Sequence, residues 1–133
     1  MLSLLQISVK DFLNIHQKKV LIIPPEMSFK ELTELLKKHE ENFAIVQKEG
    51  KPVGIVTERD IARAYLDEYP LDMPIYHIAK KELVKINSSS SLLEAFNLMT
   101  ENYIRRLVVV NENGEFEGML TQQDLILYST EEL

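Results

Sequence analysis

Hydrophobic residues in this chain fall into short continuous runs and into longer stretches where they recur every three or four positions. Short apolar runs are typical of buried strands, and the wider spacing is typical of a helix with one buried face. Six strands are predicted, at Val20–Ile23, Phe43–Val46, Val53–Thr57, Leu83–Ile86, Leu107–Val110 and Phe116–Thr121. Five helices are predicted, within Met1–His16, over Ser28–Glu41 and from Asp60, Ser91 and Asp124.

Two of the predicted helices begin with Ser-x-x-Glu, one at Ser28 and one at Ser91. In this pattern the serine and glutamate side chains satisfy backbone N–H groups that the first helical turn leaves unpaired. One face of the first of these helices is predicted to carry Phe29, Leu32, Leu35, Leu36 and His39, and the buried side of the second is predicted to carry Leu92, Phe96, Met99 and Tyr103.

The order strand, helix, strand, strand, helix occurs twice along the chain. The first strand and helix start match their counterparts at an offset of 63 residues, and everything from Asn42 onward matches at 64. The identical pairs are Val46/Val110, Gly50/Gly114, Gly54/Gly118, Thr57/Thr121 and Asp60/Asp124. We therefore predict an α+β fold of two β-α-β-β-α repeats with mixed three-stranded sheets, packed as a pseudo-twofold pair. Residues 1–70 hold the first repeat with an approach segment, and residues 71–133 hold the second.

Each repeat has a Thr-x-x-Asp where its last strand runs into its last helix, Thr57/Asp60 in the first and Thr121/Asp124 in the second. One interpretation is a helix cap, in which hydroxyl and carboxylate satisfy unpaired N–H groups. The other is a ligand site, in which the helix start faces a phosphate while the carboxylate binds a ribose diol. The presence of two copies in register favours the ligand site more than one copy would.

Composition narrows the range of functions. The 133 residues carry a net charge of −6 and contain no cysteine, so a nucleic-acid partner is not expected and disulfides and zinc–thiolate sites are excluded. An apolar run of membrane-spanning length and a secretory leader are both missing, so we expect a cytoplasmic protein with no membrane partner. The three histidines have no metal-ligand spacing, and no metal is predicted.

The duplicated order of parts, each copy ending in Gly-apolar-apolar-Thr-x-x-Asp-apolar, resembles the cystathionine β-synthase (CBS) domain, and a tandem pair resembles the Bateman module. The segments that carry the resemblance are Ile104–Val110 with Gly114, Gly118–Thr121, and Phe43–Val46 through Ile61. The likeness covers roughly residues 7–129.

The resemblance implies binding of an adenosine-containing ligand (AMP, ADP, ATP or S-adenosylmethionine) in clefts between the repeats. Carried over to this sequence, the first cleft consists of Lys19, Val20, Leu21, Arg105, Met119, Thr121 and Asp124. The second cleft consists of Ile55, Thr57, Arg59, Asp60, Glu82, Leu83 and Val84. The apolar strand residues would sandwich adenine, the aspartates would hold the ribose, and the threonines and Arg105 would meet phosphate.

The two clefts are not expected to be equivalent. Glu41 occupies the position in the first repeat that Arg105 occupies in the second, and its charge would repel a phosphate unless Arg59 offsets it. The second repeat has Gln122-Gln123 where the first has Glu58-Arg59. We therefore expect ATP or ADP to prefer the Arg105 cleft.

The leading functional hypothesis is a non-catalytic regulatory module that needs no cofactor and signals ligand occupancy to an unidentified effector protein. The alternative is a structural dimerisation module with empty or degenerate clefts. An enzyme needs a nucleophile with a positioned base, or a pair of carboxylates in a pocket of its own. The sequence offers no such set once Asp60 and Asp124 are assigned to ligand binding, so catalysis is not expected. A homodimer is expected from the family habit of pairing through helices, here Phe29–Lys38 and Leu92–Thr100 or the helices after Asp60 and Asp124.

Overall fold

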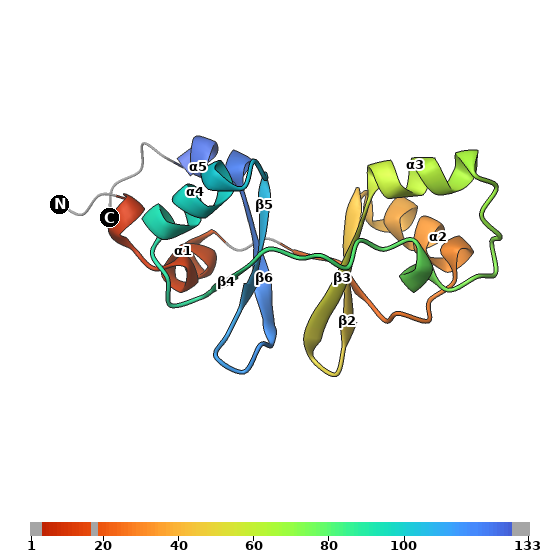
Figure 1. Ribbon diagram of the computed structural model, residues 1–133, viewed down its shortest axis with the longest axis horizontal. Helices are drawn as coiled ribbons and strands as arrows, with labels where there is room; N and C mark the ends of the chain where they lie inside the picture. The colour runs from red at the N-terminus through yellow and green to blue at the C-terminus, as the bar shows by residue number, and fades with distance from the viewer. Residues whose placement is uncertain (1–3, 17–18, 129–133) are drawn as a thin grey trace. The chain divides into compact units, whose positions relative to one another are not determined.

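The computed structural model describes residues 4–16 and 19–128, which form two compact units (Figure 1). The first-repeat unit is the continuous segment Val20–Leu83. The second-repeat unit combines the N-terminal segment up to Lys19 with the chain from Val84 onward. These units differ from the halves 1–70 and 71–133, because the N-terminal segment folds with the second repeat and the end of the linker folds with the first.

The first-repeat unit is a three-stranded sheet with two helices on one face (Figure 1). Strand β1 runs parallel to β2, and β2 runs antiparallel to β3, so the sheet is mixed. Its elements are β1 (Ile22–Ile23), α2 (Phe29–His39), β2 (Phe43–Lys48), β3 (Lys51–Thr57), α3 (Glu58–Leu66) and the 3₁₀ turn η2 (Ile75–His77).

The second-repeat unit repeats this plan, with β4 parallel to β5 and β5 antiparallel to β6. Its elements are η1 (Leu4–Gln6), α1 (Val9–Ile15), β4 (Lys85–Asn87), α4 (Leu92–Glu101), β5 (Arg106–Val110), β6 (Phe116–Thr121) and α5 (Gln122–Tyr128). The predicted α+β class and the duplicated mixed sheets are therefore confirmed.

Each unit has its own hydrophobic core between the sheet and its helices. In the first-repeat unit, Phe29 and Leu32 of α2 pack with Val46 and Val56 of the sheet. In the second-repeat unit the core gathers residues from α1, α4, α5 and all three strands, namely Val9, Phe12, Ile86, Leu92, Ala95, Met99, Leu107, Val109, Leu120 and Leu125. Apolar burial of this extent is the main term that stabilises each unit.

The two Ser-x-x-Glu predictions are confirmed as helix caps. Ser28 Oγ accepts a hydrogen bond from the Glu31 amide at 3.1 Å, and Ser91 Oγ accepts one from the Glu94 amide at the same distance. Because a cap needs only residues three positions apart, its geometry follows from local sequence.

The predicted buried face of α4 is wrong at two positions. Leu92, Ala95 and Met99 are buried, whereas Phe96 is 42% exposed and Tyr103 is 95% exposed. Tyr103 lies beyond the end of the helix with a φ of 53°, so it does not continue the helical stripe. Phe96 lies one position past Ala95, which is 0% exposed, and the turn of about 100° between adjacent helical residues carries Phe96 toward solvent.

The first strand of each repeat is shorter than predicted. Only Ile22–Ile23 and Lys85–Asn87 are strand, although the carbonyl of Leu21 accepts a hydrogen bond from the Ile45 amide and that of Val84 accepts one from the Val108 amide. The loop between Val110 and Phe116 has five residues, as the predicted strand bounds require. In this loop, Asn111 Oδ1 accepts hydrogen bonds from the amides of Asn113 and Glu115.

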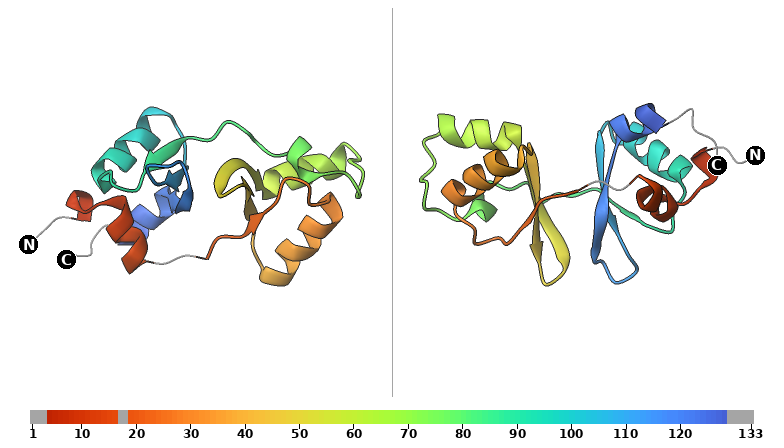
Figure 2. Two further views of the ribbon diagram at one scale, coloured as in Figure 1. Left: turned by 90° about the horizontal axis from the view of Figure 1, so that it is seen from below. Right: turned by 180° about the vertical axis from the view of Figure 1, so that it is seen from behind.

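The N-terminal segment completes the second repeat. The Leu92 amide donates to the Ile7 carbonyl at 3.0 Å, and the Val9 amide donates to the Ser90 carbonyl at 2.7 Å. Helix α1 therefore begins beside the start of α4, and the views in Figure 2 show α1, in red, packed within this unit.

The linker completes the first repeat with matching bonds. The Phe29 amide donates to the Met73 carbonyl at 2.9 Å, and the Ile75 amide donates to the Met27 carbonyl at 2.7 Å. Ile75 is fully buried in the core of this unit. Two segments of unrelated sequence thus hold the starts of α4 and α2 in the same way.

Candidate ligand-binding site

The junction of β6 with α5 fixes the Thr121–Asp124 pair. The Thr121 amide donates to Asp124 Oδ2 at 2.9 Å, and the Asp124 amide donates to Thr121 Oγ1 at 3.1 Å. Asp124 is only 6% exposed. These two bonds are those of a helix cap, and the capping interpretation is confirmed for this pair.

The junction of β3 with α3 has a related geometry with a different hydroxyl orientation. The Thr57 amide donates to Asp60 Oδ2 at 2.8 Å, and the Thr57 hydroxyl lies 2.9 Å from the same oxygen, to which it donates. Asp60 is partly exposed. Because an ionised carboxylate accepts several hydrogen bonds, capping and ribose binding are compatible roles for both aspartates.

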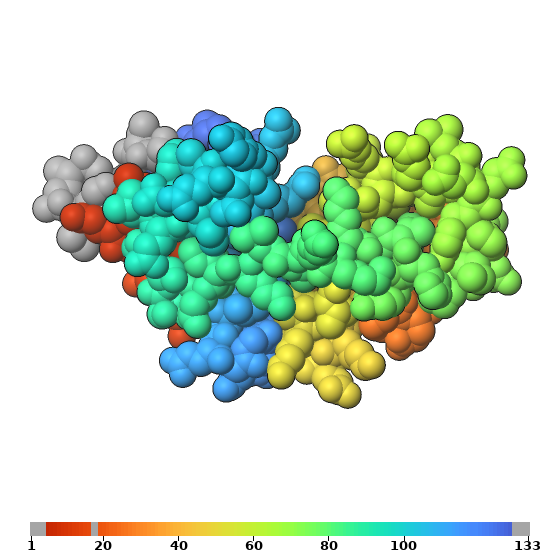
Figure 3. Space-filling model, in the orientation of Figure 1, coloured from red at the N-terminus to blue at the C-terminus, as the bar shows by residue number. Residues whose placement is uncertain are grey.

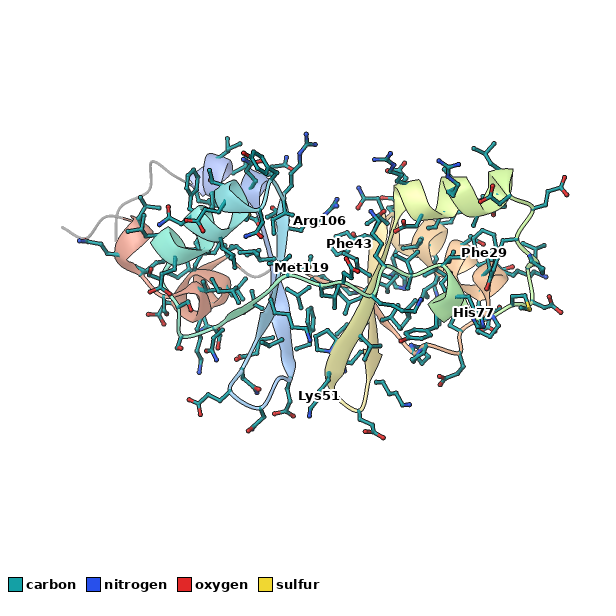
Figure 4. All side chains as sticks on the ribbon, viewed as in Figure 1. Phe29, Phe43, Lys51, His77, Arg106 and Met119 are labelled. Carbon is teal, nitrogen blue, oxygen red and sulfur yellow. The ribbon has the colours of Figure 1, made fainter. Side chains whose placement is uncertain are left out.

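A hollow of about 400 Å³ opens beside Thr121 in the second-repeat unit. We call it the arginine hollow. Its described lining residues are Arg105, Arg106, Thr121, Gln122, Gln123 and Ile126. The Gln122 amide donates to the Arg105 carbonyl at 2.8 Å, which ties the start of α5 to the residue before β5. Both arginines are exposed, and Figure 4 shows Arg106 at the start of β5. Paired guanidinium groups beside a hydroxyl are well suited to bind a phosphate.

A smaller, acidic hollow of the first-repeat unit lies between α2 and α3, on the helix side of the sheet, and its described lining does not include Thr57. This hollow, here called the acidic hollow, measures about 200 Å³. Its described lining residues are Thr33, Leu36, Glu41, Asn42, Glu58, Ile61 and Tyr65. Glu41 is half-buried and Glu58 is exposed. Arg59, which the sequence suggested as an offsetting charge, does not line this hollow.

Ile55 and Met119 lie on the sheet faces that point away from the helices. In the first-repeat unit, Val56 and its register partner Ala44 belong to the helix-side core, so the neighbouring Ile55 points to the other face. In the second-repeat unit, Leu120 belongs to the core, and Met119, labelled in Figure 4, points to the other face. Each repeat thus has a buried apolar side chain two residues before its threonine, with Ile55 8% and Met119 1% exposed.

The linker pairs with β3 at Ile55. The Ile55 amide donates to the Lys80 carbonyl and the Lys80 amide donates to the Ile55 carbonyl, both at 2.9 Å. This bridge brings the segment leading to Glu82 and Leu83 to the strand that carries Ile55 and Thr57. Sequence reasoning missed Lys80, because its pairing joins residues 25 positions apart in sequence.

The structure thus brings Arg105 together with Thr121 and joins Ile55 to the linker. The contribution of Lys19, Val20 and Leu21, and that of Glu82, Leu83 and Val84, to a ligand pocket stays a prediction. Sequence reasoning assigned neither Arg106 nor Glu58 to a site. Their positions directly after Arg105 and Thr57 are the signal that could have indicated them.

Within residues 4–16 and 19–128, the structure has no group of three or more potential metal-ligating side chains. Over the same described ranges, no helix has the length and apolar character that crossing a membrane requires.

Comparison with known proteins gives a consistent result. A family model for the CBS domain matches residues 9–67 and again residues 75–131. The CBS domain-containing protein YhcV of Bacillus subtilis is 33% identical over 119 residues, which are 89% of this chain and 82% of that protein. The chain spans 65%, 22% and 44% of the length of three uncharacterised curated relatives, from Acidianus ambivalens, Methanocaldococcus jannaschii and Methanopyrus kandleri respectively.

Solved structures of CBS domain proteins have a fold similar to that of this chain. The CBS domain protein PAE2072 from Pyrobaculum aerophilum, complexed with AMP, is 30% identical with a TM-score of 0.75, covering 90% of each chain. The CBS domain pair of protein MJ0100, in complex with 5′-methylthioadenosine and S-adenosyl-L-methionine, is 25% identical with a TM-score of 0.74, covering 92% of this chain and 94% of that one. With both repeats matched by the family model, this chain belongs to the CBS domain family.

Proposed function

We propose that this chain is a non-catalytic regulatory module that binds an adenosine-containing ligand and passes its occupancy to a partner protein. The observation that carries the proposal is the arginine hollow, where two guanidinium groups lie beside Thr121 and next to a carboxylate fixed in orientation. Two relatives of similar fold were solved with AMP or with S-adenosylmethionine and methylthioadenosine, which supports the same ligand class here.

Each residue of the second-repeat site has a proposed role. Asp124 accepts hydrogen bonds from the ribose hydroxyls, and Thr121 with Arg105 binds the phosphate. Met119 packs against adenine, a flat surface that tolerates any apolar partner. The remaining proposed contacts of this site are Lys19, Val20 and Leu21.

The first-repeat site uses the matched positions. Asp60 takes the ribose role, Thr57 faces the 5′ end of the nucleoside, and Ile55 packs against adenine. The remaining proposed contacts are Arg59, Glu82, Leu83 and Val84. The aspartates of both repeats accept hydrogen bonds from threonine amides, which suits fixed binding groups better than acid–base catalysts that gain and lose protons.

A thermal-shift screen on the full chain tests ligand binding. AMP, ADP, ATP, S-adenosylmethionine, methylthioadenosine and NAD are the probes, because a ligand that binds only the folded state raises the melting temperature by mass action. We expect a concentration-dependent rise with at least one adenosine compound and none with guanosine monophosphate as the control. Identical melting curves with all probes at millimolar concentration would remove the proposal in favour of the structural alternative.

Calorimetry with ATP tests the phosphate assignment. We expect Arg105→Ala to weaken ATP clearly and Glu41→Ala to strengthen it or reveal a second site, because unit charges about 4 Å apart interact by roughly 4 kcal/mol at an effective dielectric near 20. Lys10→Ala, which removes an exposed cation from α1 outside the arginine hollow, is the charge-matched control. Equal ATP affinities in the parent and both test variants would refute the assignment.

We also propose that the chain forms a homodimer through exposed apolar helix faces of the second-repeat unit. Leu93 and Phe96 of α4 are 48% and 42% exposed, and Ile126 and Leu127 of α5 are 69% and 61% exposed. Figure 3 shows α4, in cyan, on the outer surface of its unit. The outward residues of α2 are instead mostly charged, among them Lys30, Glu34 and Lys37. An apolar helix face of this kind is suited to an isologous contact with a second copy.

Light scattering at micromolar concentration tests this contact. We expect a dimer mass for the parent chain and a monomer mass for Phe96→Asp, with Lys37→Asp on α2 as the matched control that remains dimeric. A monomer mass for the parent would remove the dimer proposal and leave ligand binding untouched.

A further inference from the structure

A second exposed apolar surface lies at the end of α3, in residues 65–73, which we call the acidic edge. Its large apolar side chains are Tyr65, Leu66, Leu71 and Met73, which are 55%, 79%, 50% and 39% exposed. Figure 3 shows this stretch, in yellow-green, on the outer surface of the first-repeat unit. Large apolar side chains gathered in this way mark interaction sites, whereas a single exposed leucine does not.

The backbone of the acidic edge is held in place by hydrogen bonds. The Tyr69 hydroxyl donates to the Pro74 carbonyl at 2.7 Å, and the Tyr69 amide donates to the Ala64 carbonyl at 2.9 Å. The Lys30 amide of α2 donates to the Leu71 carbonyl at 2.9 Å. Because the edge is already ordered, a partner that covers its apolar side chains pays little to fix the backbone.

The charge of the acidic edge indicates the kind of partner. Asp67, Glu68 and Asp72 lie among the apolar residues and are exposed. Over residues 58–76, five carboxylates stand against two arginines, a net charge of −3. This charge disfavours an anionic lipid surface or a nucleic acid and favours a protein with lysine or arginine side chains.

The acidic hollow continues this surface, because Tyr65 lines the hollow and also belongs to the edge. Leu36 and Ile61 form an apolar wall in the hollow, while Glu41 and Glu58 add two carboxylates. A concave apolar space bordered by carboxylates is suited to an apolar anchor side chain with cations beside it. Apolar and basic residues alternate in this way on a cationic amphipathic helix.

We infer that the acidic edge and the acidic hollow form a docking surface for a cationic amphipathic helix of a partner protein. An apolar side chain of that helix enters the hollow, its neighbours cover Leu66 and Leu71, and its lysines or arginines face the carboxylates. This inference rests on the proposed function for the existence of a partner. Helix α3 connects the docking surface with the candidate ligand site, because it begins at the Thr57 cap and ends at Leu66.

Fluorescence anisotropy with the full chain tests the surface. The probe is a labelled synthetic peptide of about 18 residues, in which leucine recurs at helical spacing and lysine fills the other positions. We expect micromolar binding that weakens as salt rises from about 0.05 to 0.5 M. A scrambled peptide of the same composition should bind at least about fivefold more weakly, and a peptide with glutamate in place of lysine should not bind.

Apolar variants test the edge itself. We expect Leu66→Ser with Leu71→Ser to weaken peptide binding at least about fivefold. Ile15→Ser on α1 is the matched control, because Ile15 is 52% exposed, and it should bind the peptide like the parent. Melting curves check that each chain is folded, and Leu66→Ser alone replaces the double variant if that variant does not fold.

Charge variants test the carboxylates. Asp67→Lys with Glu68→Lys should weaken peptide binding at least about fivefold and reduce its salt dependence. Glu112→Lys, in the exposed loop after β5, is the control for a simple change of net charge and should have a smaller effect.

Amide spectra by nuclear magnetic resonance locate the peptide on the parent chain. We expect shift changes in α3 and in residues 65–73. Shift changes confined to α4 and α5 would overturn the inference, as would equal peptide affinity in the parent and the edge variants or no peptide binding to the parent. A dimeric parent that becomes monomeric with Leu66→Ser and Leu71→Ser would assign the surface to a second copy and also overturn it.

Melting curves with the adenosine probes separate this inference from the function on which it rests. The edge variants should keep the parent's response to those probes, because the substituted residues lie outside the candidate ligand site. If an adenosine probe raises the melting temperature and the peptide does not bind, only the docking surface fails. If the peptide binds through the edge and every adenosine probe leaves the melting temperature unchanged, the proposed regulatory function fails.

Discussion

The two repeats share their backbone plan and differ in the charges of the side chains near their last strand-to-helix junctions. Both Thr-x-x-Asp junctions hold an aspartate by the threonine amide, at 2.8 Å in the first repeat and 2.9 Å in the second. In the second repeat the guanidinium groups of Arg105 and Arg106 lie in the hollow that Thr121 lines. In the first repeat, Glu41 and Glu58 instead line a hollow between α2 and α3. Duplication therefore preserved the features that the backbone requires and left the exposed positions able to diverge.

The repeats also differ in what covers their last strand. A Cβ on Gly54 would lie 3.2 Å from both the Ala79 Cβ and the Lys80 carbonyl oxygen, because the linker crosses β3 there. A Cβ on Gly118 would lie 3.1 Å from a methyl of Leu13 in α1, and Gly118 also has a φ of +159°. Gly54 is required because the linker packs closely against β3. Gly118 is required because a Leu13 methyl lies close to it and because its backbone conformation disfavours other residues.

The largest expected effect is on stability, from the two glycines. We expect Gly54→Ala and Gly118→Ala each to lower the free energy of unfolding by about 3 kcal/mol, through overpacking and through backbone strain respectively. Adding Ala79→Gly should recover part of the loss in Gly54→Ala, because it removes one of the two close contacts. Adding Leu13→Ala should recover little in Gly118→Ala, because the Leu13 methyl is the far end of a flexible side chain and the backbone strain remains.

Urea unfolding measures the free energy of unfolding of the two glycine variants and of the two double variants, which form two double-mutant cycles. Each rescuing substitution alone is the control for its own cost. Recovery in both cycles, or in neither, would contradict the assignment of different causes to the two glycines.

The next effect is on ligand binding by Asp124. We expect Asp124→Ala to weaken an adenosine phosphate by about 1.5–3 kcal/mol, as for a lost hydrogen bond to a charged acceptor. Because Asp124 is 6% exposed and accepts from the Thr121 amide, the variant should also lose about 1 kcal/mol of stability as a lost cap. The partly exposed Asp60 should cost less stability when replaced by alanine.

Calorimetry and melting curves on the same samples separate these two effects. Asp124→Asn, which retains an oxygen for the cap, should recover the stability while binding the ligand more weakly than the parent. A large fall in melting temperature with unchanged affinity would show that Asp124 acts only as a cap.

The smallest effect comes from a feature that the repeats share. Glu40 and Tyr103 match at the ends of α2 and α4 and have left-handed φ values of 54° and 53°. The next amide donates back into the helix in both, from Glu41 to Leu36 and from Ile104 to Met99, at 3.0 Å each. Glycine at either position should raise the free energy of unfolding by about 0.5–1 kcal/mol, since it adopts this conformation without a Cβ penalty.

Urea unfolding of Glu40→Gly and Tyr103→Gly measures this pair, with Lys38→Gly inside α2 as a control that should destabilise. Equal gains would support the equivalence of the two helix ends. A loss on Tyr103→Gly alone would show that the exposed tyrosine ring makes a stabilising contact that its exposure does not suggest.

Sequence reasoning succeeded where the physics is local. The caps at Ser28 and Ser91 and the strand-to-helix junctions at Thr57 and Thr121 depend on residues three positions apart, and the structure shows them as predicted. The duplication was visible because identical turn and junction residues recur at a constant offset. The fold class followed from the order of these local parts.

Only the tertiary structure decided what covers each sheet and which charges gather beside each junction. Ile7 binds the start of α4 and Lys80 pairs with Ile55, although neither contact has a sequence signal, because backbone hydrogen bonds between distant segments are nearly independent of side-chain identity. Phe96 was misplaced because helical spacing marks a stripe but does not say which of two adjacent positions meets the sheet. Arg105, Arg106 and Gln122 line one hollow because the chain returns through a hairpin, and a grouping of that kind is a property of the fold.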